Sequence, residues 1–220
     1  MEKSQSSEFE VDSRDVHLQS KVRSLRTVDN ARVGVTALAL LMGLTVLGVS
    51  GNTLSVYNQT RPADTTILSL WPDQFNIRPT VSLVVGSTIV MIANIVALCF
   101  SKVPTLRSKT MMHTSTTFVA PLIGVIAALI AIIFFYTVNA SDDVDTFLSW
   151  TCRWSHVPMT QQPSWGTLCD QSRTALYLAI LLIPVEAAAL GLAGFQLKME
   201  KYADSYATAT QRKGSPSLSH

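Results

Sequence analysis

Residues 174–197 read TALYLAILLIPVEAAALGLAGFQL, an almost unbroken apolar run in which Glu186 is the only charged residue. An α-helix rises 1.5 Å per residue, so roughly 20 apolar residues are needed to cross the 30 Å hydrocarbon core of a bilayer. Three further runs of similar length contain no charge at all: Val33–Val56, Thr80–Phe100 and Thr116–Val138. The sequence therefore predicts a protein that crosses a membrane four times.

We expect an all-α fold, in which the four runs form a four-helix transmembrane bundle. The expected segments are an N-terminal tail (1–30), helices (31–56, 80–100, 116–138 and 174–198), loops (57–79, 101–115 and 139–173) and a disordered C-terminal tail (199–220). The N-terminal tail has two interpretations. Disordered chain is favoured, and the alternative is a short amphipathic helix on the membrane surface, because Leu18, Val22 and Leu25 recur at near-helical spacing beside basic residues.

Basic residues are concentrated on one side of the predicted membrane. Of the 17 Lys and Arg, 13 lie in segments 1–32, 101–115 and 198–220, which four crossings place on the same side. Because cytosolic segments carry an excess of Lys and Arg, both termini are predicted to be cytosolic. The expected location is the plasma membrane or an endomembrane of the secretory pathway. A net charge of +2 is too small to indicate a nucleic-acid partner.

Loop 139–173 contains two cysteines on the predicted extracytosolic side, where disulfides can form. We predict a Cys152–Cys169 disulfide, since closing a loop of this length removes roughly 3 kcal/mol of chain entropy from the unfolded state. The alternative is a pair of reduced thiols. A metal site is not expected, because further Cys or His ligands at suitable spacing are lacking. Asn58 and Asn139 begin Asn-x-Ser/Thr sequons on the same predicted side, so each is a candidate glycosylation site.

Two sequence features bear on contacts with other molecules. Trp150, Trp154 and Trp165 surround the cysteine pair. Anchoring at the membrane interface is the favoured interpretation, and a disulfide-closed surface that binds a partner is the alternative. Small residues recur in three of the apolar runs, and we expect most of them to let the helices of the bundle pack closely. Association of two copies through one such stripe is the alternative.

Glu186 is the costly residue of the fourth run. Inserting its carboxyl is penalised by roughly 3 kcal/mol, which the Leu, Ile, Val and Phe residues of the run offset with roughly 5 kcal/mol. No Lys, Arg or His lies inside any run, so we expect a neutral, hydrogen-bonded carboxyl. Counting from the helix ends places Thr45 and Thr88 at its depth. A structural role is favoured, and proton coupling or binding of an amine is the alternative.

The layout resembles that of tetraspan proteins of the MARVEL type, and especially of small four-pass proteins of fungi. The shared features are four spans, cytosolic termini and a cysteine pair between the third and fourth spans. Claudin-like proteins carry paired cysteines in the first loop, and tetraspanins have a Cys-Cys-Gly motif in the large loop, whereas here Arg153 follows Cys152. The resemblance implies roles in membrane-domain organisation, vesicle traffic or assembly of partner proteins.

The sequence contains no pattern that indicates an enzyme. All four histidines lie outside the cores of the apolar runs, and neither Cys-x-x-Cys nor a Gly-rich phosphate loop occurs, so no cofactor is expected. We predict a non-enzymatic organiser or accessory subunit that acts through lateral and lumenal contacts. Its expected partners are the lipid bilayer and other membrane proteins, with a homo-oligomer as a further candidate. The alternative is a small transporter or channel subunit that uses Glu186.

Overall fold

The computed structural model describes residues 4–61, 70–102, 110–140, 144–159 and 163–213. In these parts of the chain the elements are α1 (Ser4–Thr60), β1 (Phe75–Asn76), α2 (Arg78–Lys102), α4 (Thr110–Asn139), β2 (Asp145–Thr146), α5 (Phe147–Arg153) and α6 (Trp165–Lys213). Each of the four long helices is long and apolar enough to cross a membrane. The predicted helical architecture is therefore confirmed. Membrane insertion and the side on which the termini lie stay predictions.

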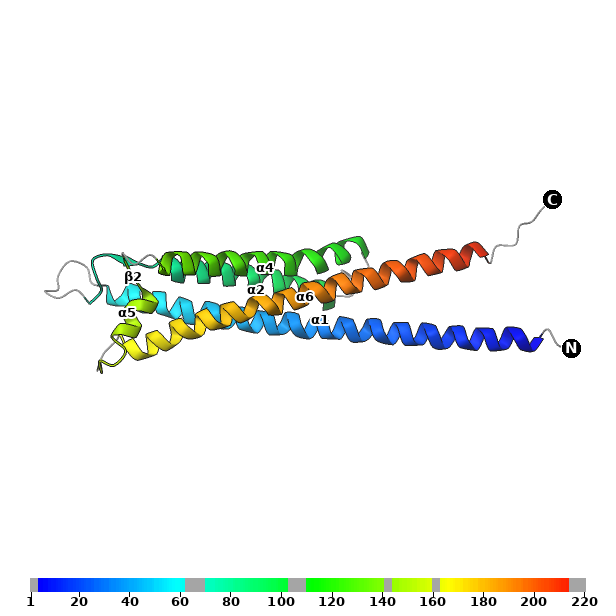
Figure 1. The fold of residues 1–220 in the computed structure, drawn as a ribbon, viewed down its shortest axis with the longest axis horizontal. Coiled ribbons are helices and arrows are strands. Elements are labelled where there is room, and N and C mark those ends of the chain that lie inside the picture. Colours follow the sequence, from blue (N-terminus) through cyan, green and yellow to red (C-terminus); the bar gives the residue numbers. More distant parts are fainter. Residues whose placement is uncertain (1–3, 62–69, 103–109, 141–143, 160–162, 214–220) are drawn as a thin grey trace.

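The four long helices form an up-and-down bundle (Figure 1). α1 packs against α2 and α6, and α4 packs against the same two helices on the other side, so α2 and α6 face each other across the diagonal. Both chain termini extend from one end of the bundle, which we call the terminal end. The opposite end carries α5 and the two strands, and we call it the cap end.

α1 and α6 continue well past α2 and α4 at the terminal end (Figure 1). The 57 residues of α1 span about 86 Å, almost three times the hydrocarbon core of a bilayer. The favoured expectation, disorder in both tails, is therefore wrong. α1 begins at Ser4, so the alternative of a helix within residues 1–30 describes this tail better, and α6 continues through Lys213, with 1–3 and 214–220 outside the described residues. Once a span has nucleated a helix, each added residue gains a hydrogen bond, so polar segments can continue it.

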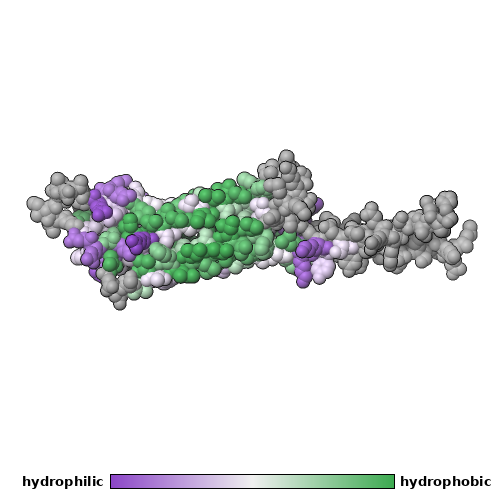
Figure 2. All heavy atoms as spheres, turned by 90° about the horizontal axis from the view of Figure 1, so that it is seen from above, coloured by the Kyte–Doolittle hydropathy of each residue, from purple (hydrophilic) through white to green (hydrophobic). Residues whose placement is uncertain are grey.

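The surface of the bundle carries a continuous apolar band with hydrophilic patches at both ends (Figure 2). Large side chains point outward within this band, and Leu41, Ile130 and Ile133 are each 62% exposed. The interior holds many small residues, including the buried Ala39 and Ala128. In a bilayer, large apolar side chains are solvated by hydrocarbon and gain little from burial inside the protein. Small residues can then line the contacts between helices.

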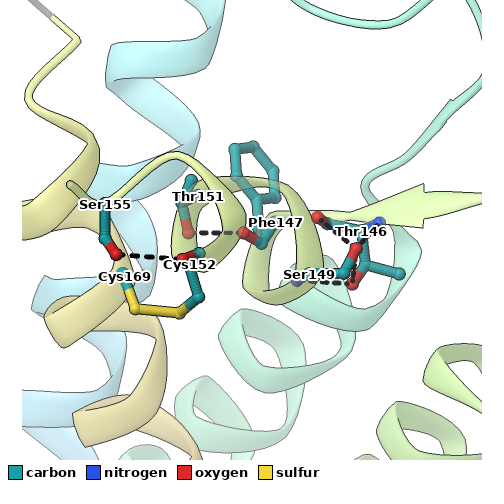
Figure 3. Close-up of a disulfide and its surroundings, with 7 residues drawn as sticks. All are labelled: Thr146, Phe147, Ser149, Thr151, Cys152, Ser155 and Cys169. Atoms are coloured by element: carbon teal, nitrogen blue, oxygen red, sulfur yellow. Dashed lines mark hydrogen bonds between the residues drawn. A yellow bond between two sulfur atoms is a disulfide. The ribbon is translucent and has the colours of Figure 1, made fainter. Parts of the chain in front are cut away.

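The cap end is tied together by a strand pair and a disulfide. β1 pairs with β2 in parallel, which joins the segment before α2 to the segment after α4. α5 begins with a capping box, in which the side chains of Thr146 and Ser149 bond each other's backbone N–H groups. The disulfide between Cys152 and Cys169 links α5 to α6 and confirms the predicted bridge (Figure 3). α6 begins at Trp165, so the last residues of the predicted loop 139–173 belong to this helix.

A buried aromatic cluster fills the space beneath the cap. Trp71 lies at its centre, with ring centroids of neighbouring aromatics 5.0–5.6 Å away in mostly edge-to-face contacts. Its indole Nε1 donates a hydrogen bond to the Thr60 hydroxyl at 3.0 Å. The buried members of the cluster are Tyr57, Trp71, Phe147, Trp165 and Leu168. We call α5, the two strands and the segments that join them the cap. Aromatic packing therefore holds the cap on the bundle in addition to the disulfide.

Candidate functional site around Glu186

The Glu186 carboxyl lies at the centre of the bundle and is fully buried, with 0% of the residue exposed. Its Oε1 atom accepts a hydrogen bond of 2.6 Å from Nδ2 of Asn94 on α2. The same nitrogen donates to the carbonyl of Val90 at 3.0 Å, so both hydrogens of the amide are used. Since α2 and α6 are the diagonal pair, this bond crosses the middle of the bundle.

Gly124 of α4 provides the space into which the carboxyl fits. A Cβ atom at this position would lie 2.7 Å from Cδ and Oε2 of Glu186, and 3.0 Å from Oε1. Any side chain there would collide with the carboxyl unless Glu186 moved. Glu186, Asn94 and Gly124 therefore form one arrangement contributed by three helices, which we call the Glu186 site.

Within the described part of the chain, the second carboxyl oxygen of Glu186 has no hydrogen-bond partner. Oε2 is buried, and none of the described residues offers it a hydrogen bond. An ionised carboxylate would place an uncompensated charge in this apolar interior, which is far more costly than burying a neutral acid. The geometry suits a neutral carboxyl that carries its proton on Oε2 and accepts the Asn94 amide at Oε1. Such a group can hold a proton and release it.

The prediction that Thr45 and Thr88 lie beside Glu186 is wrong. Thr45 is exposed on the outer face of α1 and donates to the Leu41 carbonyl, and Thr88 likewise donates to its own helix, at Val84. From Thr88 to Asn94 is about 9 Å along the helix axis. The depth count assumed that all four apolar runs end at one plane. In the structure α6 continues past the end of α2, so Glu186 lies nearer the terminal end than expected.

A small cavity of about 10 Å³ lies beyond Asn94 toward the terminal end, and Glu186 itself does not line it. Asn94 lines it, together with polar side chains from three helices: Arg32, Thr36, Ser101 and Thr117. Arg32 is buried, and its Nη2 donates to Asp29 at 2.9 Å and to the Ser101 hydroxyl at 3.3 Å. Polar groups thus connect the bundle centre to the end from which both termini extend. Sequence reasoning missed this feature because it assigned Arg32 to the segment flanking the membrane.

The other side of Glu186, toward the cap, is packed with apolar side chains. One buried cluster consists of Ala39, Val90, Ala127, Ala128 and Leu182. A second cluster, built around Val46, Leu83, Ile132, Phe135 and Leu176, lies nearer the cap. Ser50, Thr53, Thr80 and Ser87 are also buried on this side. The hydroxyls of Thr53 and Ser87 donate to carbonyls of their own helices, whereas the Ser50 hydroxyl has no partner among the described residues. The surroundings of Glu186 are therefore asymmetric along the bundle axis.

The remaining predicted site residues lie at the cap end, away from Glu186. Asn58 is exposed in the last turn of α1. Asn139 ends α4 and is half-buried, and its Oδ1 accepts a 2.6 Å hydrogen bond from the Thr146 hydroxyl. This bond uses Oδ1 and leaves the Nδ2 atom to which a glycan would attach, so the two asparagines differ mainly in exposure. Glycosylation of either residue stays a prediction.

The three tryptophans of the predicted loop do not share one environment. Trp165 is buried in the aromatic cluster against Trp71. Trp154 is 42% exposed and packs against Trp150, with ring centroids 5.7 Å apart. A structural role fits Trp165, and Trp154 is the one free to contact the membrane interface or a partner.

The small residues also divide into two groups. A Cβ at Gly43 would lie 3.7 Å from the Val90 side chain, and one at Gly86 would lie 2.6 Å from the Ala131 side chain, so these two face the inside of the bundle as predicted. Around Gly34, Gly48, Gly51, Gly191 and Gly194 a Cβ would meet nothing within 4 Å. The expectation that most small residues serve packing within the bundle is wrong for this second group.

Within the described part of the chain, no group of three or more His, Cys, Asp or Glu residues could hold a metal ion. The chain matches no known protein family, no curated protein sequence and no solved structure.

Proposed function

We propose that this chain is a non-enzymatic, four-pass membrane protein that organises or assists other membrane proteins. It acts through lateral contacts of α1 and α6 and through contacts of its cap. Both termini lie in the cytosol and the cap lies on the extracytosolic side, in the plasma membrane or an endomembrane of the secretory pathway. The observation that carries the proposal is the set of outward-facing glycines.

Gly34 and Gly48 in α1, and Gly191 and Gly194 in α6, have open space where a side chain would project. A glycine within a helix costs about 1 kcal/mol relative to alanine, and these four glycines gain no contact within the chain in return. Small residues allow the backbone of another helix to approach closely, which is how helices associate in lipid. We call the open positions at these four glycines notches. α1 and α6 pack against each other, so the notches lie on neighbouring helices.

The cap supplies a second surface for contacts. Trp154, Val157 and Met159 are each 40–42% exposed, close to the disulfide. These three residues directly follow α5, which the disulfide and its capping box hold in place. Little conformational freedom is therefore lost when this surface binds. Tryptophan is enriched among the residues that dominate binding energy at interfaces. The arrangement supports contacts of the cap with a lumenal or extracellular partner.

A small transporter or channel subunit that uses Glu186 ranks second. Transport past Glu186 requires polar groups or space on both sides of the carboxyl. The polar side chains and the cavity lie toward the terminal end, whereas the cap side is filled by apolar clusters. The single observation in favour of this role is the buried carboxyl itself.

Co-purification of the full-length chain from its native membrane tests the organiser role. Gly48→Leu and Gly191→Leu fill outward notches, and Trp154→Ala removes the exposed aromatic of the cap. Leu41→Phe is the matched control, because it adds bulk at an outward position of α1 that is already occupied by a large side chain. We expect at least one notch or cap variant to lose a specific partner that the control retains. An unchanged set of partners in all variants would contradict the proposal.

A further inference from the structure

The asymmetry around Glu186 carries an inference that is independent of the organiser role. Toward the terminal end, the carboxyl is linked to Asn94 at 2.6 Å, and Asn94 lines a cavity that also reaches Arg32 and Ser101. Toward the cap, buried apolar side chains close off the bundle interior. The carboxyl therefore has a polar connection to one end of the bundle and an apolar seal toward the other.

We propose that the Glu186 site binds and releases a proton, and that it exchanges this proton only with the aqueous phase at the terminal end. The orphaned Oε2 atom carries the exchangeable proton, and Asn94 holds Oε1. Binding forms the O–H bond of a neutral carboxylic acid, and release transfers the proton to water, which leaves the carboxylate.

The geometry excludes larger ligands. A single methyl carbon at Gly124 would already lie 2.7 Å from the carboxyl, so no room exists there for an amine-bearing molecule. The adjoining cavity of about 10 Å³ is near the smallest that holds one water molecule, and such a water needs two or more polar partners. Asn94, Thr36, Thr117 and Ser101 supply polar groups on its wall. A proton carried by water is the ligand that fits this space.

The charged groups nearest the site lie at this end. From α1 these are Arg32 and its ion-pair partner Asp29, with 2.9 Å between Nη2 and Oδ1. Among the described side chains of α2 and α4 that line the cavity, none is charged. The Arg32–Asp29 ion pair therefore lies on the route by which the proton leaves. The cap side offers no comparable charge among the residues of the two apolar clusters.

Carbodiimide labelling of the full-length chain in proteoliposomes tests this assignment. Dicyclohexylcarbodiimide enters the bilayer and modifies only protonated carboxyls, and mass spectrometry of the α6 peptide reports the modification. The orientation of the chain is fixed by capture through a tag on its C-terminus, and the pH on the two sides is varied independently. Glu186→Gln, which keeps an acceptor for Asn94, defines the unlabelled background.

We expect labelling of Glu186 to fall when the terminal side is made alkaline, by about tenfold per pH unit once the carboxyl titrates. Alkalinising the cap side alone should leave labelling unchanged. Labelling that responds to the cap side, or that ignores the pH on both sides, would overturn the proposal. Failure of Glu186 to react at any pH at which the chain stays folded would overturn it as well.

A pair of isosteric variants on α1 tests the route. Thr36 lines the cavity, whereas Thr45 faces outward, and each hydroxyl donates at 2.9 Å to the carbonyl four residues earlier. After a pH jump on the terminal side, labelling of Glu186 changes to a new rate. Thr36→Val should slow this change by about fivefold, as expected for the loss of one hydrogen bond along the route. Thr45→Val should leave it unchanged. Equal responses in the two variants would show that the cavity is not the route.

Discussion

Gly124→Ala tests the packing of three helices around the Glu186 carboxyl. The new methyl carbon would lie 2.7 Å from Cδ and Oε2, well inside the 3.5–4.0 Å at which carbon atoms pack. The carboxyl ends a flexible side chain, so it can swing away. It would then lose the 2.6 Å bond from Asn94 and leave a buried donor unsatisfied, which costs about 1–3 kcal/mol. Alanine gains about 1 kcal/mol of helix propensity, so the net destabilisation is about 0–2 kcal/mol.

A double-mutant cycle isolates the contact. In a Glu186→Ala background the colliding atoms are absent, and Gly124→Ala should stabilise the fold by about 1 kcal/mol through helix propensity alone. The two backgrounds therefore differ by a coupling energy of about 1–3 kcal/mol. Gly48→Ala is the matched control, because a Cβ at Gly48 meets nothing within 4 Å. It should give the same stabilisation in both backgrounds.

The assay is reversible unfolding of the purified chain in mixed micelles, with SDS as the denaturant and helix content measured by circular dichroism. The free energy of unfolding is compared for the four members of each cycle. A Gly124–Glu186 coupling energy below about 0.5 kcal/mol, within the scatter of additive sites, would refute the packing described here. A coupling of equal size in the Gly48 cycle would show that the effect is not local.

Three further perturbations follow from the same contacts. Cys152→Ser and Cys169→Ser should each lower the free energy of unfolding by about 3 kcal/mol, with no added loss in the double variant, as thermal unfolding under non-reducing conditions would show. Asn94→Leu removes the only described donor to the Glu186 carboxyl and should cost about 1–3 kcal/mol, whereas Glu186→Gln keeps an acceptor for Asn94 and should cost less than about 1 kcal/mol in the SDS titration. Trp71→Phe loses the indole bond to Thr60 and should cost about 1 kcal/mol, and a change below about 0.3 kcal/mol would contradict that bond.

The sequence predicted the features that depend on composition and on chain connectivity. Four long apolar runs become four long helices, and Cys152 and Cys169 are joined because α5 and α6 bring them together. The ends of the helices were predicted less well. Polar residues at 4–30 and 199–213 continue α1 and α6, since apolar length marks where a helix can meet hydrocarbon and does not mark where the helix stops.

The centre of the candidate site was predicted, but its surroundings were not. Glu186 was identified because a carboxyl is costly in an apolar run. Its bond with Asn94 was not predicted, because it depends on how far α2 and α6 are shifted along each other. A signal was present, because Asn94 is the one side-chain amide deep within the run 80–100. The contact of Gly124 with the carboxyl, and the inward position of Arg32, depend on the rotation of each helix about its axis. Length and hydropathy do not determine that rotation.

We expect the four helices to cross a bilayer and to leave both termini on the cytosolic side. Protease mapping of sealed, right-side-out vesicles that contain a doubly tagged chain tests it most directly. Both terminal tags should resist digestion until the membrane is permeabilised, while the cap is accessible from outside, and carbonate should not extract the chain. Digestion of one terminal tag alone, or release of the chain by carbonate, would contradict it.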